Sequence, residues 1–146
     1  MMTHPGKKLN FMGNELAMFR EWDERREVDW QLFLLPEHQA FHRYISELNS
    51  LYLANQALWE ADGTYEGFQW LDCKSDNKCL FGYTRTAAFQ TVLALFNFSD
   101  REAEMPQYNG KLLLHTDWKR FGGGKAEDEP STKLPPFSGG LIVCEN

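Results

Sequence analysis

The feature that most constrains the fold is a change of pattern near residue 62. Residues 36–54 read PEHQAFHRYISELNSLYLA, and their apolar side chains recur at helical spacing to form one stripe: Phe41, Tyr44, Ile45, Leu48, Leu51 and Tyr52. Pro36 suits the first turn of a helix, where its missing N–H has no bond to lose. The spacing therefore predicts one helix over 36–54. Two glycines in ADGTYEG (61–67) then interrupt the pattern.

Beyond residue 62 the chain reads as short strands separated by Gly, Asp and Asn turns. The expected strands are GFQWLD (67–72), CLFGYTR (79–85), TVLALFNFS (91–99), EAEMPQY (102–108), KLLLHTD (111–117) and a last one centred on 141–143. Strands of this length with such turns are typical of an antiparallel sandwich or barrel. FGGGKAEDEPST (121–132) is too polar and glycine-rich for a core element, so we expect a loop there.

Composition excludes several classes of function. A hydrophobic fraction of 42 % and a charged fraction of 25 % are typical of a folded globular protein. The net charge of −6 argues against a nucleic-acid or anionic-membrane partner, since phosphate binding needs clustered Lys and Arg. No apolar run approaches the roughly 18 residues of a membrane span, and MMTHPGKK does not resemble a signal peptide. We therefore expect a cytoplasmic protein.

Cysteines and histidines give no metal signature. The three cysteines are an odd number; Cys73 and Cys79 flank a turn and could pair, although free thiols are the expectation for the cytoplasm. His38 and His42 are four residues apart on the expected helix without a third ligand, which favours a solvated helix face over a metal site. We expect no metal and no cofactor.

The N-terminal stretch KKLNFMG (7–13) reads as one strand, with Leu9, Phe11 and Met12 apolar and Gly13 ending the run. An apolar strand followed by a polar loop and a helix is typical of a (β/α)8 barrel, whose active site lies at the C-terminal ends of the strands. One strand cannot close a barrel, so this stretch has no visible partner.

Several strings together resemble a known family. HPGKKLNFMGNE (4–15), REWD (20–23), GFQWLD (67–72), FNFS (96–99), HTD (115–117) and LPPFSG (134–139) occur in order and at similar spacing to the C-terminal end of bacterial 1,4-α-glucan (glycogen) branching enzymes. These enzymes belong to the α-amylase superfamily. Each string is weak by itself, but their order and spacing together are specific, and they extend over almost the whole chain.

The resemblance implies an α+β architecture in two parts. Residues 1–62 would be the end of the catalytic (β/α)8 barrel, with its last strand, a loop and the closing helix. Residues 63–146 would be the family's C-terminal all-β antiparallel sandwich. The lone strand 7–13 would then be a remnant of a barrel whose other strands precede it in the longer enzymes.

The resemblance also implies the chemistry of the parent enzymes. Branching enzymes cut an α-1,4 glucan and transfer the piece to a glucan 6-hydroxyl by a retaining mechanism, which requires a carboxylate nucleophile and a carboxylic acid. In this family those carboxylates lie on earlier barrel strands. We therefore expect no catalytic residue in this chain and no activity from the chain alone.

Four residues are candidate substrate-binding residues by the same resemblance. Asn14 and Glu15 would shape the donor-sugar pocket, or only order their loop. Trp22 would stack on glucose or pack under the loop. Trp70 would hold an α-glucan chain or lie in a core between domains, and Trp118 is a further exposed candidate.

Two expectations concern partners. An isolated strand has open edges that recruit other strands, so residues 7–13 predict a homodimer or larger assembly, or docking of the strand onto the chain's own sandwich or helix. Two alternatives to an inert enzyme portion also follow: a free-standing α-glucan-binding sandwich, and a subunit that pairs with a separate barrel. Binding of glycogen, or copurification with such a barrel, would distinguish them.

Overall fold

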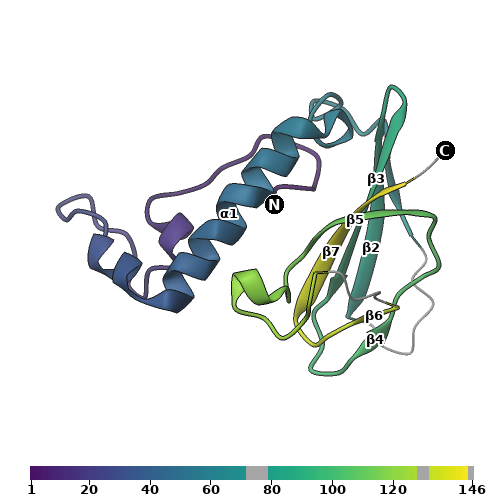
Figure 1. Ribbon diagram of the computed structural model, residues 1–146. Helices are drawn as coiled ribbons and strands as arrows, with labels where there is room; N and C mark the ends of the chain where they lie inside the picture. Colours follow the sequence, from purple (N-terminus) through teal and green to yellow (C-terminus); the bar gives the residue numbers. More distant parts are fainter. Residues whose placement is uncertain (72–78, 128–131, 145–146) are drawn as a thin grey trace.

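The structure is a computed structural model that describes residues 1–71, 79–127 and 132–144. One long helix, α1 (Pro36–Ala54), has the bounds that the apolar stripe predicts, with Pro36 in its first turn. Its C-terminal half lies beside an antiparallel sheet, and its N-terminal half projects away from it (Figure 1). Tyr44, Leu48 and Leu51 of the predicted stripe pack against the sheet.

The sheet has five strands in the order β1-β2-β3-β7-β5, and every neighbouring pair is antiparallel. Their bounds are Phe68–Trp70 (β1), Leu80–Ala87 (β2), Gln90–Asn97 (β3), Ser138–Cys144 (β7) and Gly110–His115 (β5). A separate pair joins β4 (Ala103–Glu104) to β6 (Lys133–Leu134). The antiparallel all-β organisation predicted for the second half is thus present.

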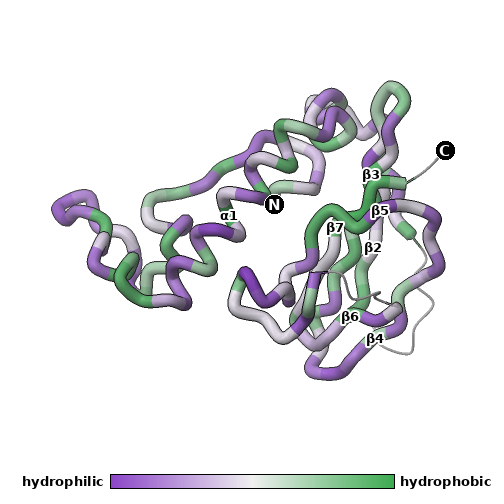
Figure 2. Tube along the Cα trace, viewed as in Figure 1, coloured by the Kyte–Doolittle hydropathy of each residue, from purple (hydrophilic) through white to green (hydrophobic). Residues whose placement is uncertain are grey.

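Alternate residues of the central strands face two different layers. Tyr83, Ala94, Leu141 and Leu114 stand opposite one another across four strands and meet Leu48 of α1. Figure 2 shows hydrophobic residues along β3 and β7 in the middle of the sheet.

On the other face, Leu93, Leu95 and Ile142 pack against Ala103 of β4 and Leu134 of β6. Because these two short strands and their loops form that layer, the second sheet of the expected sandwich is much smaller than the first. EAEMPQY was expected to be one strand, yet only Ala103–Glu104 is one. Pro106 follows closely and has no N–H for a strand ladder.

The prediction of a strand over 7–13 is wrong. Residues 7–11 have no regular secondary structure and 12–13 form a turn. A strand exists only when a neighbour satisfies its backbone N–H and C=O groups, and no other strand of the described chain pairs with this stretch. Residues 7–13 are therefore an irregular segment that leads into the 3₁₀ helix at Asn14–Leu16, and their origin in a barrel stays a prediction.

Short 3₁₀ helices shape the remaining connections: η1 (Asn14–Leu16), η2 (Trp30–Leu34), η3 (Gln56–Leu58) and η4 (Lys119–Phe121). Between β2 and β3 the turn is tighter than the sequence suggests. Both strands extend until only Ala88 and Phe89 remain, and Ala88 adopts a positive φ of 49°. The predicted division at residue 62 stays a prediction.

Candidate functional site

Three of the four candidate residues lie in one segment, residues 9–35, which we call the arm. η1 begins after Gly13, whose φ of 81° places it in the left-handed region. Leu16 of η1 is fully buried, and its carbonyl accepts a hydrogen bond of 2.6 Å from Nδ1 of His38. Nδ1 of His42 lies 3.4 Å from the carbonyl of Glu15. The two histidines of α1 therefore hold η1 in place, a role that sequence reasoning missed.

Asn14, Glu15 and Trp22 lie on this anchored segment. Asn14 is exposed and donates from Nδ2 to Oδ1 of Asn10 at 2.8 Å. The Glu15 side chain is half-buried. Trp22 is half-exposed and meets Phe11 edge-on, with ring centroids 5.3 Å apart. The arm thus carries an amide, a carboxylate and an indole on one anchored segment, and their binding role stays a prediction.

Arg20 closes the loop that follows. Its Nε and Nη2 bind the two carboxylate oxygens of Asp29 at 2.8 and 2.9 Å, and Nη2 also donates to the carbonyl of Glu27 at 2.6 Å. The hydrogen bond from Arg20 lowers the pKa of Asp29 below its ordinary value. A bidentate pair of this kind fixes two segments in orientation as well as distance, so it holds the loop that carries Trp22.

A second cluster joins the N-terminal segment, α1 and the sheet. Asp62 accepts hydrogen bonds from Lys8 (2.8 Å), Arg85 (2.8 Å) and Tyr52 (3.0 Å). Arg85 is almost fully buried and also donates to the carbonyl of Thr3 at 3.0 Å. Burial would raise the pKa of Asp62, but the hydrogen bonds from Lys8 and Arg85 lower it below its ordinary value. We call Lys8, Tyr52, Asp62 and Arg85 the Asp62 cluster.

Trp70, the fourth candidate, lies away from the arm on the edge strand β1. It is 56 % exposed and borders a groove of about 470 Å³. The sheet contributes five aromatic side chains to this groove: Trp70, Phe81, Tyr83, Phe96 and Phe98. Residues of the segment 1–7 form the other wall. We call this hollow the aromatic groove. Phe81 and Tyr83 are two residues apart on β2, and Phe96 of β3 is two residues before Phe98, which follows the end of that strand. This period-two spacing is the sequence signal for the groove.

Trp118 is not the exposed aromatic that the sequence suggests. It is 5 % exposed and belongs to the core beneath α1, because its ring is covered by Phe121 and by the Arg120 guanidinium, which lies 4.2 Å from the ring centroid. Arg120 is held in turn by Glu47 of α1 at 2.7 Å. Trp118 therefore serves packing and not ligand contact.

Two of the sequence strings that carry the family resemblance, HTD and FNFS, contain residues that form hydrogen bonds with loop backbone. In HTD, His115 is buried and its Nδ1 accepts the N–H of Asp117 at 3.1 Å; burial lowers its pKa. Thr116 accepts the N–H of Gly139 at 2.9 Å. In FNFS, the buried Asn97 donates to the carbonyl of Pro135 at 3.0 Å. These bonds link HTD and FNFS to LPPFSG, so the three strings specify one packed end of the sheet.

Within the described residues no three His, Cys, Asp or Glu side chains gather as a metal site would require, and no helix there has the length and apolar character to cross a bilayer. The alternative of a disulfide between Cys73 and Cys79 involves Cys73, which lies outside the described residues.

Comparison with known proteins shows relatives among the 1,4-alpha-glucan branching enzymes. No protein-family model matches the chain. The 1,4-alpha-glucan branching enzyme GlgB of Desulfitobacterium hafniense is 38 % identical over 130 residues, which are 84 % of this chain and 21 % of that enzyme. The enzyme of the same name from Shewanella frigidimarina is 37 % identical over 95 % of this chain and 20 % of its own length. The chain therefore spans about a fifth of the length of these relatives.

Solved structures agree on the fold. A Salmonella typhimurium crystal structure assigned as an alpha amylase superposes with a TM-score of 0.58 at 16 % identity, covering 84 % of this chain and 19 % of the other. At this identity the similarity concerns the fold alone. The helix and antiparallel sheet seen here thus occur as part of a longer protein.

Proposed function

We propose a function from the premise that this chain belongs to the bacterial 1,4-α-glucan branching enzymes, whose C-terminal portion it matches. The chain would serve as the C-terminal portion of such an enzyme, which joins the last part of the catalytic domain to an all-β domain, with the predicted boundary between residues 62 and 63. By itself it would neither branch nor hydrolyse glucan. The observation that carries this proposal is 38 % identity over 84 % of the chain but only 21 % of the relative.

The carboxylates of the described chain support the absence of independent catalysis. A retaining transfer needs a nucleophilic carboxylate and a carboxyl group whose raised pKa keeps it protonated, about 5–5.5 Å apart. The pKa values of Asp29 and Asp62 are both lowered, and each carboxylate is already bound by an arginine. Such groups stabilise structure, and neither is suited to donate a proton to a leaving oxygen.

The arm gives the chain its place in the complete site. Asn14, Glu15 and Trp22 lie on a backbone that His38 and His42 anchor to α1. We propose that in the complete enzyme these three side chains border the donor-sugar pocket, with the amide and carboxylate binding hydroxyls and the indole offering an apolar face. We also propose the cytoplasmic location that the sequence predicts.

A chimera tests this proposal directly. The matching fifth of the D. hafniense enzyme is replaced by this chain, and branching of amylose is followed by the loss of iodine staining. We expect the chimera to branch amylose and the free chain to leave the stain unchanged. Activity from the free chain, or a folded but inactive chimera, would contradict the proposal.

The half-exposed Trp70 favours a second candidate function, a free-standing α-glucan-binding module. In that case glycogen in a native gel would retard the free chain. A homodimer through residues 7–13 remains a further proposal; its support is now the exposed side chains of Leu9, Phe11 and Met12 rather than a strand edge. Sedimentation of the free chain at several concentrations tests it.

A further inference from the structure

The helix α1 covers only part of the sheet face on which it packs. It covers that part through Leu48 and Tyr44, which pack onto Leu141 and Leu114. Beyond the helix, Trp70, Phe81 and Phe98 are 56 %, 43 % and 60 % exposed. They line the aromatic groove from β1, from β2 and from the residue that follows β3. Large aromatic side chains gathered in one hollow usually mark a surface that another molecule or domain covers.

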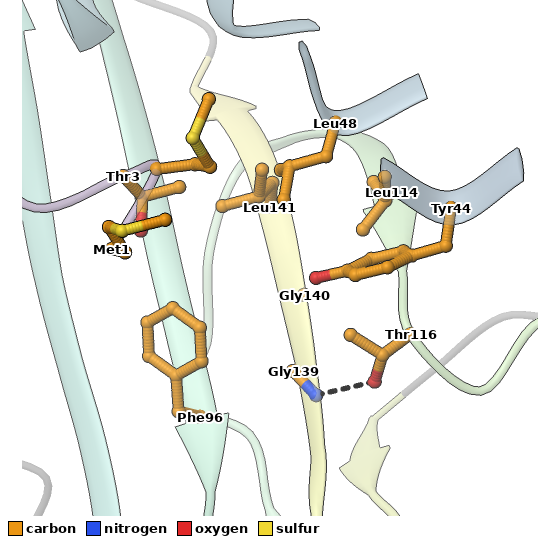
Figure 3. A pocket seen from close by; sticks show the side chains of 11 residues that line it. Met1, Thr3, Tyr44, Leu48, Phe96, Leu114, Thr116, Gly139, Gly140 and Leu141 are labelled. Atoms are coloured by element: carbon orange, nitrogen blue, oxygen red, sulfur yellow. Dashed lines mark hydrogen bonds between the residues drawn. The ribbon is translucent and has the colours of Figure 1, made fainter. Parts of the chain in front are cut away.

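The packing beside the groove is also incomplete. A cavity of about 70 Å³ lies between α1 and the sheet, and Met1 and Phe96 line both this cavity and the groove. Figure 3 shows Tyr44 and Leu48 from α1 and Leu141 from β7 around the cavity, with Met1 and Phe96 at one side. Protein interiors leave few such voids, so the apolar layer that begins under α1 continues into the groove without being filled.

The chemistry of the groove favours a polypeptide over a sugar. A glucan hydroxyl that leaves water needs a hydrogen-bond partner, since an unsatisfied buried polar group is costly. Among the described side chains that line the groove, His4, Lys7, Trp70 and Tyr83 carry polar groups, and the Tyr83 hydroxyl is bound to Thr3 at 2.6 Å. The remaining lining side chains are apolar, so few partners are available for the many hydroxyls of a glucan. Apolar side chains need no such partner.

The groove is continuous with an interface that the chain already makes. The segment 1–8 is fixed to the same face of the sheet by the bond from Arg85 to the Thr3 carbonyl and by the ring of His4, 5.2 Å from that of Phe68. His4 and the sheet aromatics then form opposite walls of the groove. An element that fills the groove would extend this interface.

We propose that the aromatic groove is the docking surface for an apolar part of the remaining branching-enzyme polypeptide, and that Trp70 is an anchor of this interface between domains. The inference rests on the proposed function, because the relatives carry the greater part of their length outside the region that this chain matches. The groove and its neighbouring cavity are then filled in the complete enzyme, and glucan binds elsewhere.

Hydroxyl-radical footprinting tests the groove residue by residue. Oxidation of Trp70, Phe81 and Phe98 is measured by mass spectrometry in the free chain, in the free chain with maltoheptaose and in the chimera, with the 86 % exposed Tyr65 as internal control. We expect oxidation of the groove aromatics to fall at least about fivefold in the chimera, as their exposed area is buried, while Tyr65 is unchanged and maltoheptaose protects nothing.

The outcomes separate this inference from the proposed function. An active chimera whose groove stays oxidisable overturns the docking surface and leaves the function standing. A folded, inactive chimera with a protected groove overturns the proposed function and leaves the docking surface standing. Protection of the free chain by maltoheptaose makes the groove a glucan site and overturns the inference. If the chimera does not fold, the free chain is mixed with the separately purified remainder of the enzyme. Protection of the groove aromatics in that mixture supports the docking surface, and unchanged oxidation overturns it.

A pair of variants adds an energetic test. Phe98→Asp places a charge in the groove, whereas Tyr65→Asp places one on open surface. In the chimera we expect Phe98→Asp to lower the melting temperature by at least about 5 °C and Tyr65→Asp to leave it unchanged. In the free chain, where the groove is open to water, the two variants should differ little. Equal effects in the chimera would overturn the proposal.

Discussion

Arg85 and Asp62 form an ion pair in the interior of the molecule, with Nη2 of Arg85 2.8 Å from Oδ1 of Asp62 and the arginine side chain only 1 % exposed. The guanidinium lies on β2 and the carboxylate in the loop after η3, so the pair joins the sheet to the end of the helical region. Because Lys8 and Tyr52 bind the same carboxylate, one residue links three segments that are distant in sequence.

Replacing Asp62 should therefore destabilise the chain strongly. Asp62→Ala leaves the buried Arg85 without a counter-charge, and breaking such a pair costs about 3 kcal/mol or more. Asp100→Ala is the matched control, because its partner Arg101 is exposed and 4.0 Å away. Urea denaturation should show a large loss of unfolding free energy for the first variant and less than about 0.5 kcal/mol for the second. Equal losses would contradict the role given to the Asp62 cluster.

The same carboxylate predicts a dependence of stability on pH. The pKa of Asp62 in the folded chain is lowered from its ordinary value of 3.8. The folded state therefore binds this proton less readily than the unfolded state, and its contribution is present above pH 3.8 and is lost as the pH falls below it. Urea midpoints between pH 7 and pH 3 should fall less steeply for Asp62→Asn than for the natural chain. Identical slopes would show that Asp62 does not contribute.

Gly67 should not tolerate a side chain. Its φ is +71°, and a Cβ there would lie 1.9 Å from the carbonyl oxygen of Thr86. Gly67→Ala should cost more than about 1 kcal/mol and separate β1 from β2, since L-residues strain at positive φ. Gly63→Ala, where a Cβ meets nothing within 4 Å, is the control. The Thr86 amide donates a hydrogen bond to the Gly67 carbonyl at 2.7 Å, so its hydrogen exchange should become faster when β1 separates from β2. Unchanged exchange would refute this prediction.

The contact between helix and sheet can be tested within α1 itself. Leu48 is buried against the sheet, whereas Leu53 on the same helix is 72 % exposed. Leu48→Ala should lower the unfolding free energy by about 2–5 kcal/mol, because it removes buried methyl groups and leaves a cavity. Leu53→Ala should change it by less than about 0.5 kcal/mol. Thermal denaturation followed by circular dichroism measures both, and comparable losses would mean that the helix does not pack as described.

The arm residues predict an effect on activity. In the active chimera, Asn14→Ala and Trp22→Ala should each lower kcat/KM for amylose by about tenfold, as expected for the loss of about 1.4 kcal/mol of transition-state contact. Glu24→Ala, on the same arm, removes only an exposed side chain whose partner Arg25 is 3.7 Å away, and it should retain full activity. If both variants kept normal kinetics, Asn14 and Trp22 would order the arm and contribute nothing to the sugar pocket.

Much of the fold follows from local patterns. The stripe from Phe41 to Tyr52 indicates a helix over 36–54, because helical periodicity is a property of neighbouring residues. The short apolar runs in 79–85 and 91–99, bounded by turn residues, indicate two strands. The candidate arm residues followed from a resemblance in sequence. The contacts that anchor them did not, since His38 and Leu16 are 22 residues apart and nothing local marks them as partners.

The sequence by itself determined the long helix, the central antiparallel strands and the resemblance to branching enzymes. Only the tertiary structure decided the state of residues 7–13, the burial of Trp118 and the exposure of Trp70. A strand needs a neighbour for its hydrogen bonds, and residues 7–13 have none in the described chain. An indole is equally apolar wherever it stands, so the segments that pack over it decide whether it belongs to a core or to a surface: η4 covers Trp118, and Trp70 borders an open groove.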